Sequence, residues 1–383
     1  MTDSVDELRR EYAVRTQPPL WQSPLQCWSL SRARAHQGSV VPRIVALSTV
    51  DYGLDAIAHV LRAGHKIDAV VGVNPSRASA SSISGWADVA EFGNRWGVPH
   101  HYVERYDLNA AADQRLFSEM RFDYLWVCGW QRLVPEWLLS AASLCAIGVH
   151  GSPDGVVAGR GRSPQNWAIM LACRSFEVAV FKLTPGVDDG PVISTRRFDY
   201  HPIDDVAMSY RKVALCVGEM MVELLDDPSL VNQARPQSGE PYYFPQRKPE
   251  DGIVDWNLAV DEVWSHCRAL SRPYPGLRTR RSPSGEVVLW GCKPFDARRP
   301  EGIPGHVGAV FEDGSFLVEC ADGRLLVDDF ECIGGVKIST NEILLGRSFM
   351  DTLRNICDRH RKHHPDQRIS PRIMRLLDGV VGE

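Results

Sequence analysis

The stretch RIVALSTVDYGLDAIAHVLRAGHKIDAVVGV, residues 43–73, decides the fold of this chain. Its apolar run 44–47 predicts a strand, the segment 54–63 predicts a helix, and the run 67–73 after Gly64 predicts a second strand. A strand, a helix and a second strand in this order are the start of a parallel α/β sheet. The stretch therefore predicts that an α/β domain begins at Arg43.

The alternation of helices and strands continues along the chain. We predict helices over 86–96, up to residue 120, over 136–144 and over 205–225, and strands near residue 101, over 124–128 and over 146–150. An open, doubly wound, Rossmann-like sheet binds its ligands beyond the carboxyl ends of its strands. Two of these ends are Gly129-Trp130 and His150-Gly151. The sequence therefore predicts a functional site at the sheet edge where both loops emerge.

A Pro-rich linker over 236–249 separates this domain from a segment of different composition. Short apolar runs alternate there with the turns Asp313-Gly314 and Asp322-Gly323, a pattern typical of β-hairpins. We predict strands over 286–290, 306–311, 315–320 and 324–327, in a small β-barrel, OB-like domain. The predicted organisation is an N-terminal extension over 1–42 with a short helix at 6–12, the first domain over 43–237, the barrel over 238–340, and a basic tail over 341–383 with a helix at 342–360.

The composition is that of an ordinary globular protein, with 44% hydrophobic and 24% charged residues. The formal net charge of −5 lacks the basic excess of many nucleic-acid binders. The 10 cysteines include no Cys-x-x-Cys pair, so we expect reduced, buried thiols rather than disulfides or a metal site. The acidic start precedes no apolar signal segment, and no apolar stretch is long enough for a bilayer. We therefore expect a cytoplasmic protein without a membrane partner.

Two polar side chains stand out at the predicted sheet edge. His150 ends a predicted strand, so its imidazole is expected at the edge, where a histidine can act as an acid or a base. Asp188 lies in a turn between two strand-like stretches, although Asp and Gly also suit turn geometry without any further role. Between these residues, a glycine-bearing loop over 160–162 runs into a helix predicted to have Ser163 as its N-cap and Pro164 at its first position.

Together these segments resemble the folate-dependent formyltransferases, a family that includes methionyl-tRNA formyltransferase, glycinamide ribonucleotide formyltransferase and amino-sugar formyltransferases. The resemblance covers residues 43–335. It rests on the order and spacing of the segment 43–46, His150-Gly151-Ser152, the segment 160–167, Gly186-Val187-Asp188 with Gly190, the segment 243–252, Asp255-Trp256 and Tyr274-Pro275-Gly276. It implies a formyltransferase fold followed by the family's C-terminal barrel-like domain.

The resemblance also implies a reaction, in which 10-formyltetrahydrofolate is the co-substrate and a formyl group is transferred to an amine. His150 and Asp188 would face the formyl group, where a histidine can stabilise the tetrahedral oxyanion and pass a proton to the leaving nitrogen, with the aspartate orienting it. We expect no metal ion. Two loops would bind the pterin of the folate, through Trp130, Gln131, Arg132, Leu133, Ser152 and Pro153.

The sequence departs from the family at one position of the predicted site. The family carries Asn two residues before the histidine, whereas this chain has Gly148 there. The loss of one oxyanion donor lowers the rate by about 10²–10³-fold. Candidate substitutes for the missing donor are Gln165, Asn166 and Arg160. The loop between His150 and Arg160 is also longer than is usual in the family.

The acceptor that these features favour is the amine of a small molecule, an amino sugar or an amino-acid derivative, in specialised biosynthesis. Initiator tRNA fits less well, because the loop 74–82 carries a single basic residue, Arg77, for phosphate contacts. A first alternative keeps the fold and changes the chemistry, to a formyl-folate hydrolase or a transferase of another acyl group. A non-catalytic binding module is the second alternative, and the presence of both His150 and Asp188 argues against it.

Overall fold

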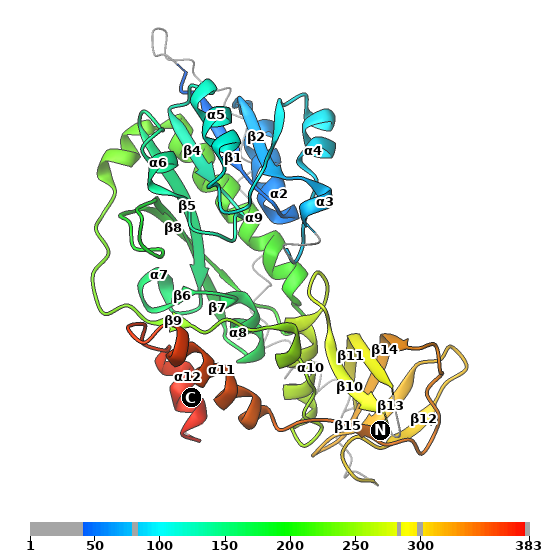
Figure 1. Cartoon of the computed structure of the whole chain (residues 1–383). Coiled ribbons are helices and arrows are strands. Elements are labelled where there is room, and N and C mark those ends of the chain that lie inside the picture. Colours follow the sequence, from blue (N-terminus) through cyan, green and yellow to red (C-terminus); the bar gives the residue numbers. More distant parts are fainter. Residues whose placement is uncertain (1–40, 79–82, 282–284, 297–301, 380–383) are drawn as a thin grey trace, which may run out of the picture. The chain divides into compact units, whose positions relative to one another are not determined.

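The computed structural model describes residues 41–78, 83–281, 285–296 and 302–379 (Figure 1), and the helix predicted over 6–12 lies outside them. The strands of the first domain are β1 (Ile44–Leu47), β2 (Ala69–Val73), β3 (His100–Val103), β4 (Tyr124–Val127), β5 (Cys145–Ser152), β7 (Ser175–Lys182) and β8 (Val192–Asp199). They form one sheet in the order β3-β2-β1-β4-β5-β7-β8. Strands β1 to β5 pair in parallel, and β7 and β8 pair antiparallel. The predicted doubly wound sheet is confirmed, with an antiparallel edge added to it.

Helices cover both faces of this sheet (Figure 1). One face carries α2 (Asp51–Arg62), α4 (Val89–Trp96) and α9 (Val206–Asp226), and the other carries α5 (Ala111–Glu119) and α6 (Glu136–Leu139). Successive residues of β1 alternate between the two cores, as the pleat of a strand requires. The short α3 (Pro75–Ala78) follows β2. The helix predicted over 136–144 ends early, because the backbone N–H groups of Ser143 and Leu144 bond to the start of β4 instead.

Strand β5 holds His150 inside the strand rather than at its end. The parallel pairing with β4 stops at Val127 and Gly148, but the antiparallel pairing with β7 continues to Ser152 and Glu177. His150 therefore lies beyond the end of β4 on one side and is held by β7 on the other. The prediction that His150 closes its strand is wrong, because the apolar pattern ends where β4 ends and does not reveal that β7 continues the ladder.

The linker between the domains is partly structured. It carries β9 (Tyr243–Phe244), which pairs with β6 (Arg160–Gly161), and it lies between the 3-10 turns η2 (Pro228–Gln233) and η3 (Pro249–Asp251). This pairing ties the loop that precedes α8 (Pro164–Met170) to the linker. The loop after β5 forms one further short helix, α7 (Gly155–Ala158).

The second domain is an antiparallel sheet packed against α10 (Val260–Leu270). Its strands are β10 (Leu277–Arg281), β11 (Glu286–Asp296), β12 (Val307–Val310), β13 (Phe316–Glu319), β14 (Arg324–Ile333) and β15 (Leu344–Leu345). Their order is β12-β13-β14-β11-β10-β15, and a bridge between His306 and Ile343 connects the two ends of the sheet. The sheet therefore curls toward a barrel, as predicted. Strands β10 and β15 were not predicted, and β11 and β14 are longer than their apolar runs.

The tail begins with a strand rather than a helix. The helix predicted over 342–360 is α11 (Phe349–His363), which starts later because Ile343 and β15 pair with the barrel and Ser348 caps the helix. A second helix, α12 (Pro371–Leu377), follows. Among the described residues, no helix is long and apolar enough to cross a membrane.

Side chains of both predicted domains share one apolar core. Trp167, on α8, is fully buried in the core that the barrel, α10, α11 and α12 also line. Tyr52 stacks on Tyr210, and the hydroxyl of Tyr210 is hydrogen-bonded to that of Tyr274. The contacts between the first sheet and the barrel are therefore packed and apolar, while the domain limits at 237 and 340 stay predictions.

Candidate active site

His150 and Asp188 lie together at the edge of the first sheet. His150 projects from β5, and Asp188 lies in the turn between β7 and β8. Nδ1 of His150 is 3.4 Å from Oδ2 of Asp188, and the two side chains are 10% and 22% exposed. The pair is thus largely shielded from water, with part of each side chain still accessible to a ligand.

The other ring nitrogen of His150 is held by the backbone. Nε2 lies 2.8 Å from the carbonyl oxygen of Gly159, in the loop after α7. Gly159 has room for no side chain, because an added Cβ would lie 1.6 Å from Oγ of Ser152. The small residue therefore lets the loop approach β5 closely enough for its carbonyl to fix the imidazole.

Backbone geometry and a buried network position Asp188. Its φ of 48° lies in the left-handed region, which Asp tolerates better than most residues. Nε2 of Gln237 donates to the carbonyl oxygens of Asp188 and Gly190, at 2.8 and 2.9 Å. Arg160 donates in turn to Oε1 of Gln237, at 2.7 Å. The linker residue Gln237 thus connects the Asp188 turn to the loop that holds His150.

Leu183 occupies the space beside Gly148. A Cβ added to Gly148 would lie 2.5 Å from Cδ2 and 2.9 Å from Cγ of Leu183, and 3.2 Å from Cζ of Phe181. An asparagine at this position would therefore collide with a side chain that comes from the end of β7. The absence of the usual amide is a packed feature of this chain rather than an open gap.

The three candidate oxyanion donors differ in their surroundings. Nδ2 of Asn166 donates to the carbonyl oxygen of Ala269 at 2.5 Å, so this amide nitrogen is engaged at the barrel. Gln165 is buried at the start of α8. Nε of Arg160 is buried and has no hydrogen-bond partner among the described residues. Arg160, which directly follows Gly159, is therefore the candidate with a donor to offer near His150.

The predicted pterin loop after β4 divides into a buried and an exposed part. Trp130 packs edge-on against Tyr106, with ring centroids 4.9 Å apart, and is only 9% exposed. Gln131 and Arg132 are exposed, and Leu133 is 61% exposed although it is apolar. The residues that can face a ligand are thus those after Trp130, which lies in the core beneath them.

The second predicted pterin loop is likewise divided. Ser152 is fully buried, and its Oγ accepts a hydrogen bond from the backbone N–H of Asp154 at 3.1 Å. Pro153 is half-buried beside it. Ser152 therefore shapes the loop from beneath, and Pro153 is the residue of this pair with surface to present.

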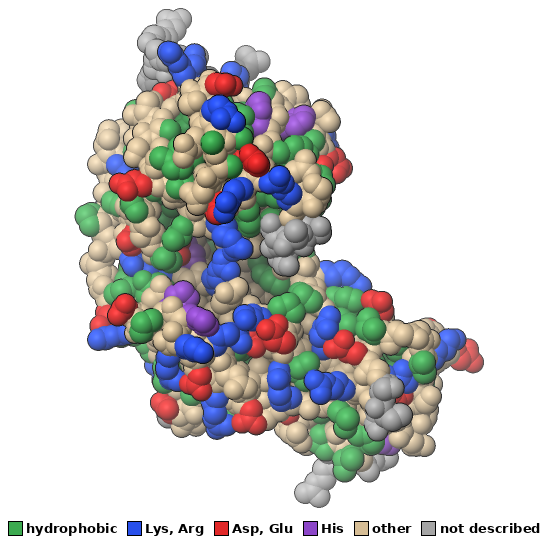
Figure 2. All heavy atoms as spheres, in the orientation of Figure 1, with side chains coloured by type: hydrophobic (Ala, Val, Ile, Leu, Met, Phe, Trp, Pro, Cys, Tyr) green, Lys and Arg blue, Asp and Glu red, His purple; other side chains and the backbone are tan. Residues whose placement is uncertain are grey.

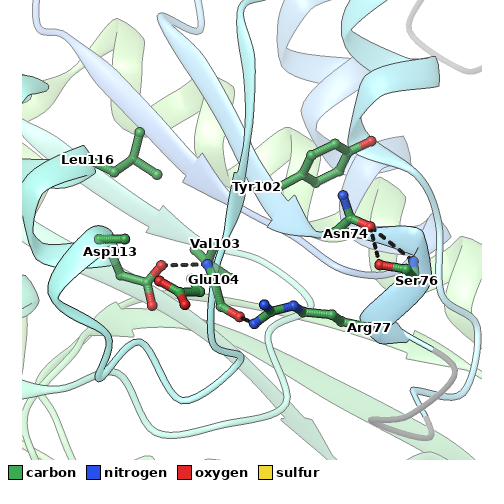
Figure 3. A pocket seen from close by; sticks show the side chains of 9 residues that line it. Asn74, Ser76, Arg77, Tyr102, Val103, Glu104, Asp113 and Leu116 are labelled. Carbon is green, nitrogen blue, oxygen red and sulfur yellow. Dashed lines mark hydrogen bonds between the residues drawn. The ribbon is translucent and has the colours of Figure 1, made fainter.

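A cavity of about 530 Å³ opens at the carboxyl ends of β2 and β3 (Figure 3). The guanidinium of Arg77 donates to the carbonyl oxygen of Glu104, and Oδ1 of Asp113 accepts from the backbone N–H of Glu104 at 2.6 Å. The lining residues are Asn74, Ser76, Arg77, Tyr102, Val103, Glu104, Ala112, Asp113 and Leu116. The cavity lies on the same edge of the sheet as the predicted site but contains neither His150 nor Asp188.

Several residues of this site were not predicted. Gly159, Gln237 and Leu183 act through a backbone carbonyl, a linker amide and a packed side chain, none of which forms a motif. The sequence offered one signal for Gly159, its position in a loop that also contains Gly155 and Gly161. In the structure these two glycines have φ angles of 79° and 97°, which favour glycine.

The contacts of His150 define what the pair can do chemically. Nε2 faces a carbonyl oxygen, which can only accept, so the proton of the neutral ring belongs on Nε2. Nδ1 then faces the Asp188 carboxylate at 3.4 Å, so its lone pair can take up a proton and the imidazolium that results can donate to Asp188. The arrangement therefore suits a general base that removes a proton from a bound amine.

The fold and the site together define a Rossmann-like domain with a His–Asp pair at its ligand edge and a C-terminal barrel. Residues 247–348 match the model of the formyl transferase C-terminal domain. Over 308 residues the chain is 25% identical to the methionyl-tRNA formyltransferase of Parvibaculum lavamentivorans. The alignment covers 79% of this chain and 96% of that protein. Both matches support the resemblance to the folate-dependent formyltransferases that the sequence predicted.

Solved structures share the fold at lower identity. HypX from Aquifex aeolicus, solved in complex with tetrahydrofolic acid, superposes with a TM-score of 0.55 at 19% identity over 83% of this chain, which spans 48% of HypX. An N-formyltransferase from Helicobacter canadensis, in complex with folinic acid and dTDP-3-aminofucose, has a TM-score of 0.50 at 11% identity, over 76% of this chain and all (100%) of that one. These likenesses confirm the mixed α/β fold with its barrel-like second domain.

Proposed function

We propose that the protein is a cytoplasmic N-formyltransferase that moves a formyl group from 10-formyltetrahydrofolate to the amine of a small molecule, an amino sugar or an amino-acid derivative. The observation that carries the proposal is the contact of His150 with both Asp188 and the Gly159 carbonyl. The bound folates of HypX and of the Helicobacter canadensis enzyme support the choice of co-substrate.

The geometry supports a mechanism in which His150 handles one proton twice. The acceptor amine attacks the formyl carbon, so that a new C–N bond forms and the carbonyl oxygen becomes an oxyanion. Nδ1 of His150 takes a proton from the attacking nitrogen, and the imidazolium then donates to Asp188 and to Gly159. The bond from the formyl carbon to N10 breaks as His150 passes this proton to N10. The products are a formamide and tetrahydrofolate.

The oxyanion needs a donor that Gly148 does not supply. Arg160 has a buried, unpartnered Nε–H beside the loop that holds His150, and we propose this group for the role. A cationic donor is stronger than a neutral amide in a water-poor site. The arrangement would thus replace the family's asparagine with a donor from the opposite loop.

A small acceptor fits the charges of the chain better than tRNA does. Arginines of the basic tail pair with carboxylates of the chain itself: Arg359 with Asp251, Arg368 with Glu240 and Arg372 with Asp154. These guanidiniums are therefore not free to bind a phosphate backbone, which is what nucleic-acid affinity chiefly needs. The curated relatives named methionyl-tRNA formyltransferase keep tRNA as a specific outcome to test.

The test combines binding and turnover. The full chain is titrated calorimetrically with 5-formyltetrahydrofolate, a stable relative of the formyl donor, beside His150→Ala and Leu133→Ala. We expect saturable binding that Leu133→Ala weakens and His150→Ala preserves, because Leu133 would contact the pterin and His150 would not. Incubation with 10-formyltetrahydrofolate and a panel of amines should then give an N-formyl product, detected by mass spectrometry, that His150→Ala abolishes.

Three results would redirect the proposal. Formate release without any amine, dependent on His150, would identify a formyl-folate hydrolase, the same fold with water as acceptor. No folate binding at accessible concentrations would refute the folate-dependent reaction and favour another acyl donor. Formylation of charged initiator tRNA with none of the small amines would replace the proposed acceptor class.

A further inference from the structure

Two arginines from different loops meet beside the proposed active site. Arg132, after β4, and Arg162, before α8, both donate to the carbonyl oxygen of Gln131, at 3.3 and 2.7 Å. The sequence placed Arg132 in a pterin loop and gave Arg162 no role. Their guanidiniums therefore lie side by side, although like charges repel.

Neither guanidinium has a carboxylate partner in the described part of the chain. Some exposed arginines elsewhere do have one, such as Arg105 with Asp107 and Arg354 with Asp351, both at 2.7 Å. Burial lowers the pKa of Arg162, and the charge of Arg132 lowers it further. Keeping two such cations adjacent and unpaired costs free energy, which an anionic ligand between them would offset.

The surroundings of the pair suit an anion. The Arg132 guanidinium lies 5.1 Å from the centre of the Tyr106 ring, and the Tyr106 hydroxyl accepts from the backbone N–H of Gln131 at 3.0 Å. On the face drawn in Figure 2, Lys and Arg side chains gather in a line below the strands β1 and β4 of Figure 1. The chain as a whole carries a net charge of −5, so this positive line is a local feature.

The pair is connected to the reacting residues by a short run of backbone. Arg162 follows Arg160 and Gly161 on the strand β6, and Gly159, just before it, holds His150. Gly161 has a φ of 97°, and an added Cβ would lie 2.6 Å from the Phe244 carbonyl oxygen, so this turn is fixed in place. A ligand group bound at Arg162 is therefore held at a defined distance from the imidazole.

We propose that Arg132 and Arg162 bind an oxyanion of the acceptor, of the phosphate or pyrophosphate type, while the acceptor's amine reaches His150. This inference rests on the proposed function and narrows its acceptor to an amine that carries such an anion. Guanidinium groups suit this role because each offers several N–H donors in a planar fork that matches phosphate oxygens. The glutamate carboxylates of the folate are the other source of an oxyanion.

The test separates the two sources of the anion. The full chain is titrated with inorganic pyrophosphate, with 5-formyltetrahydrofolate and with 5-formyltetrahydropteroate, which lacks the glutamate. The variants are Arg132→Gln, Arg162→Gln, the double variant and Arg162→Lys, with Arg354→Gln as the matched control. We expect each glutamine variant to weaken pyrophosphate binding about tenfold, since hydrogen bonds to charged groups contribute on this scale. Arg162→Lys should lie between, and Arg354→Gln should match the wild type.

Under the proposal, Arg162→Gln and Arg162→Lys bind both folate ligands as the wild type does, whereas the Arg132 variants, which change the predicted pterin loop, are compared in pyrophosphate binding alone. A loss of affinity confined to the ligand with the glutamate would assign the pair to the folate tail and overturn the acceptor assignment. Pyrophosphate binding that is absent from the wild type, or unchanged in the double variant, would show that the pair binds no such anion. A wild type that binds pyrophosphate but no folate would instead refute the proposed function and leave the anion site standing.

Discussion

Replacing Gly148 with the family's asparagine should destabilise the protein. The first atom of the new side chain would lie 2.5 Å from Cδ2 of Leu183, well inside van der Waals contact. Leu183 is half-buried, and its Cγ also lies only 2.9 Å from the added atom, so turning the terminal methyl groups of Leu183 does not clear the space. Overpacking of this kind costs about 1–3 kcal/mol. In a protein of this size, each kcal/mol of lost stability lowers the midpoint temperature of thermal unfolding by about 2–4 °C.

The measurement is a double-mutant cycle by thermal unfolding. Leu183→Ala alone should destabilise by about 1–2 kcal/mol, less than for a fully buried leucine. In the variant with both changes, the alanine leaves room for the amide. The loss of stability of this double variant should therefore be smaller than the sum of the losses of the two single variants, by at least about 0.5 kcal/mol. Formyl transfer by the double variant should exceed that of Leu183→Ala, because the asparagine adds a donor to the one proposed for Arg160.

Two results would refute this reasoning. If Gly148→Asn is as stable as the wild type, Leu183 does not occupy the space of the missing amide. If the two changes are simply additive, they do not share that space. Gly97→Asn is the matched control, because an added Cβ at Gly97 meets no atom within 4 Å, although its φ of 66° makes any side chain costly there. Its loss should not depend on Leu183.

Three further predictions concern the proton of the active site and a buried histidine. Asp188→Asn should lower kcat by about 10²–10⁴-fold with unchanged folate affinity, because it removes the negative charge that stabilises the protonated His150; an equal loss of folate affinity in calorimetry would contradict the role. Gly159→Ala should lower kcat and stability together, and adding Ser152→Gly should restore part of both, which thermal unfolding and rate measurements can check. Burial lowers the pKa of His266 from 6.5 to about 3, so the native state loses stability as pH falls below 6.5, by about 1.4 kcal/mol per pH unit. His266→Phe should flatten this dependence, and parallel pH profiles of wild type and variant would refute it.

The sheet could be predicted from the sequence because its strands are continuous apolar runs between helices. Residues 43–73 predicted β1, α2 and β2 with errors only at the ends. The path of β5 beyond His150 could not be predicted, since it depends on a partner strand, β7, that follows later in the chain. The start of the tail helix was mispredicted for the same reason. Ile343 and β15 pair with the barrel, although the local pattern suits a helix.

The candidate site was predictable where it depends on side-chain chemistry. His150 and Asp188 were predicted from their types and positions, and the structure brings them to 3.4 Å. Trp130 illustrates the opposite case, since an aromatic residue at a strand end suggests a binding surface, whereas its ring lies in the core. The sequence showed that Gly148 replaces the family's asparagine, but it did not show that Leu183 occupies the space of the missing amide.

An ion pair connects the basic tail to the loop that holds His150. The helices of the tail carry the basic residues that would suggest nucleic acid, yet Arg372 donates to Asp154 at 2.5 Å and so reaches the loop that follows β5. The hydrogen bond to Asp154 raises the pKa of Arg372, which is the sign expected of a formed ion pair. An ion pair this exposed contributes little stability, about 0–1 kcal/mol. Its effect is therefore positional: it helps to hold the loop whose Gly159 carbonyl fixes His150.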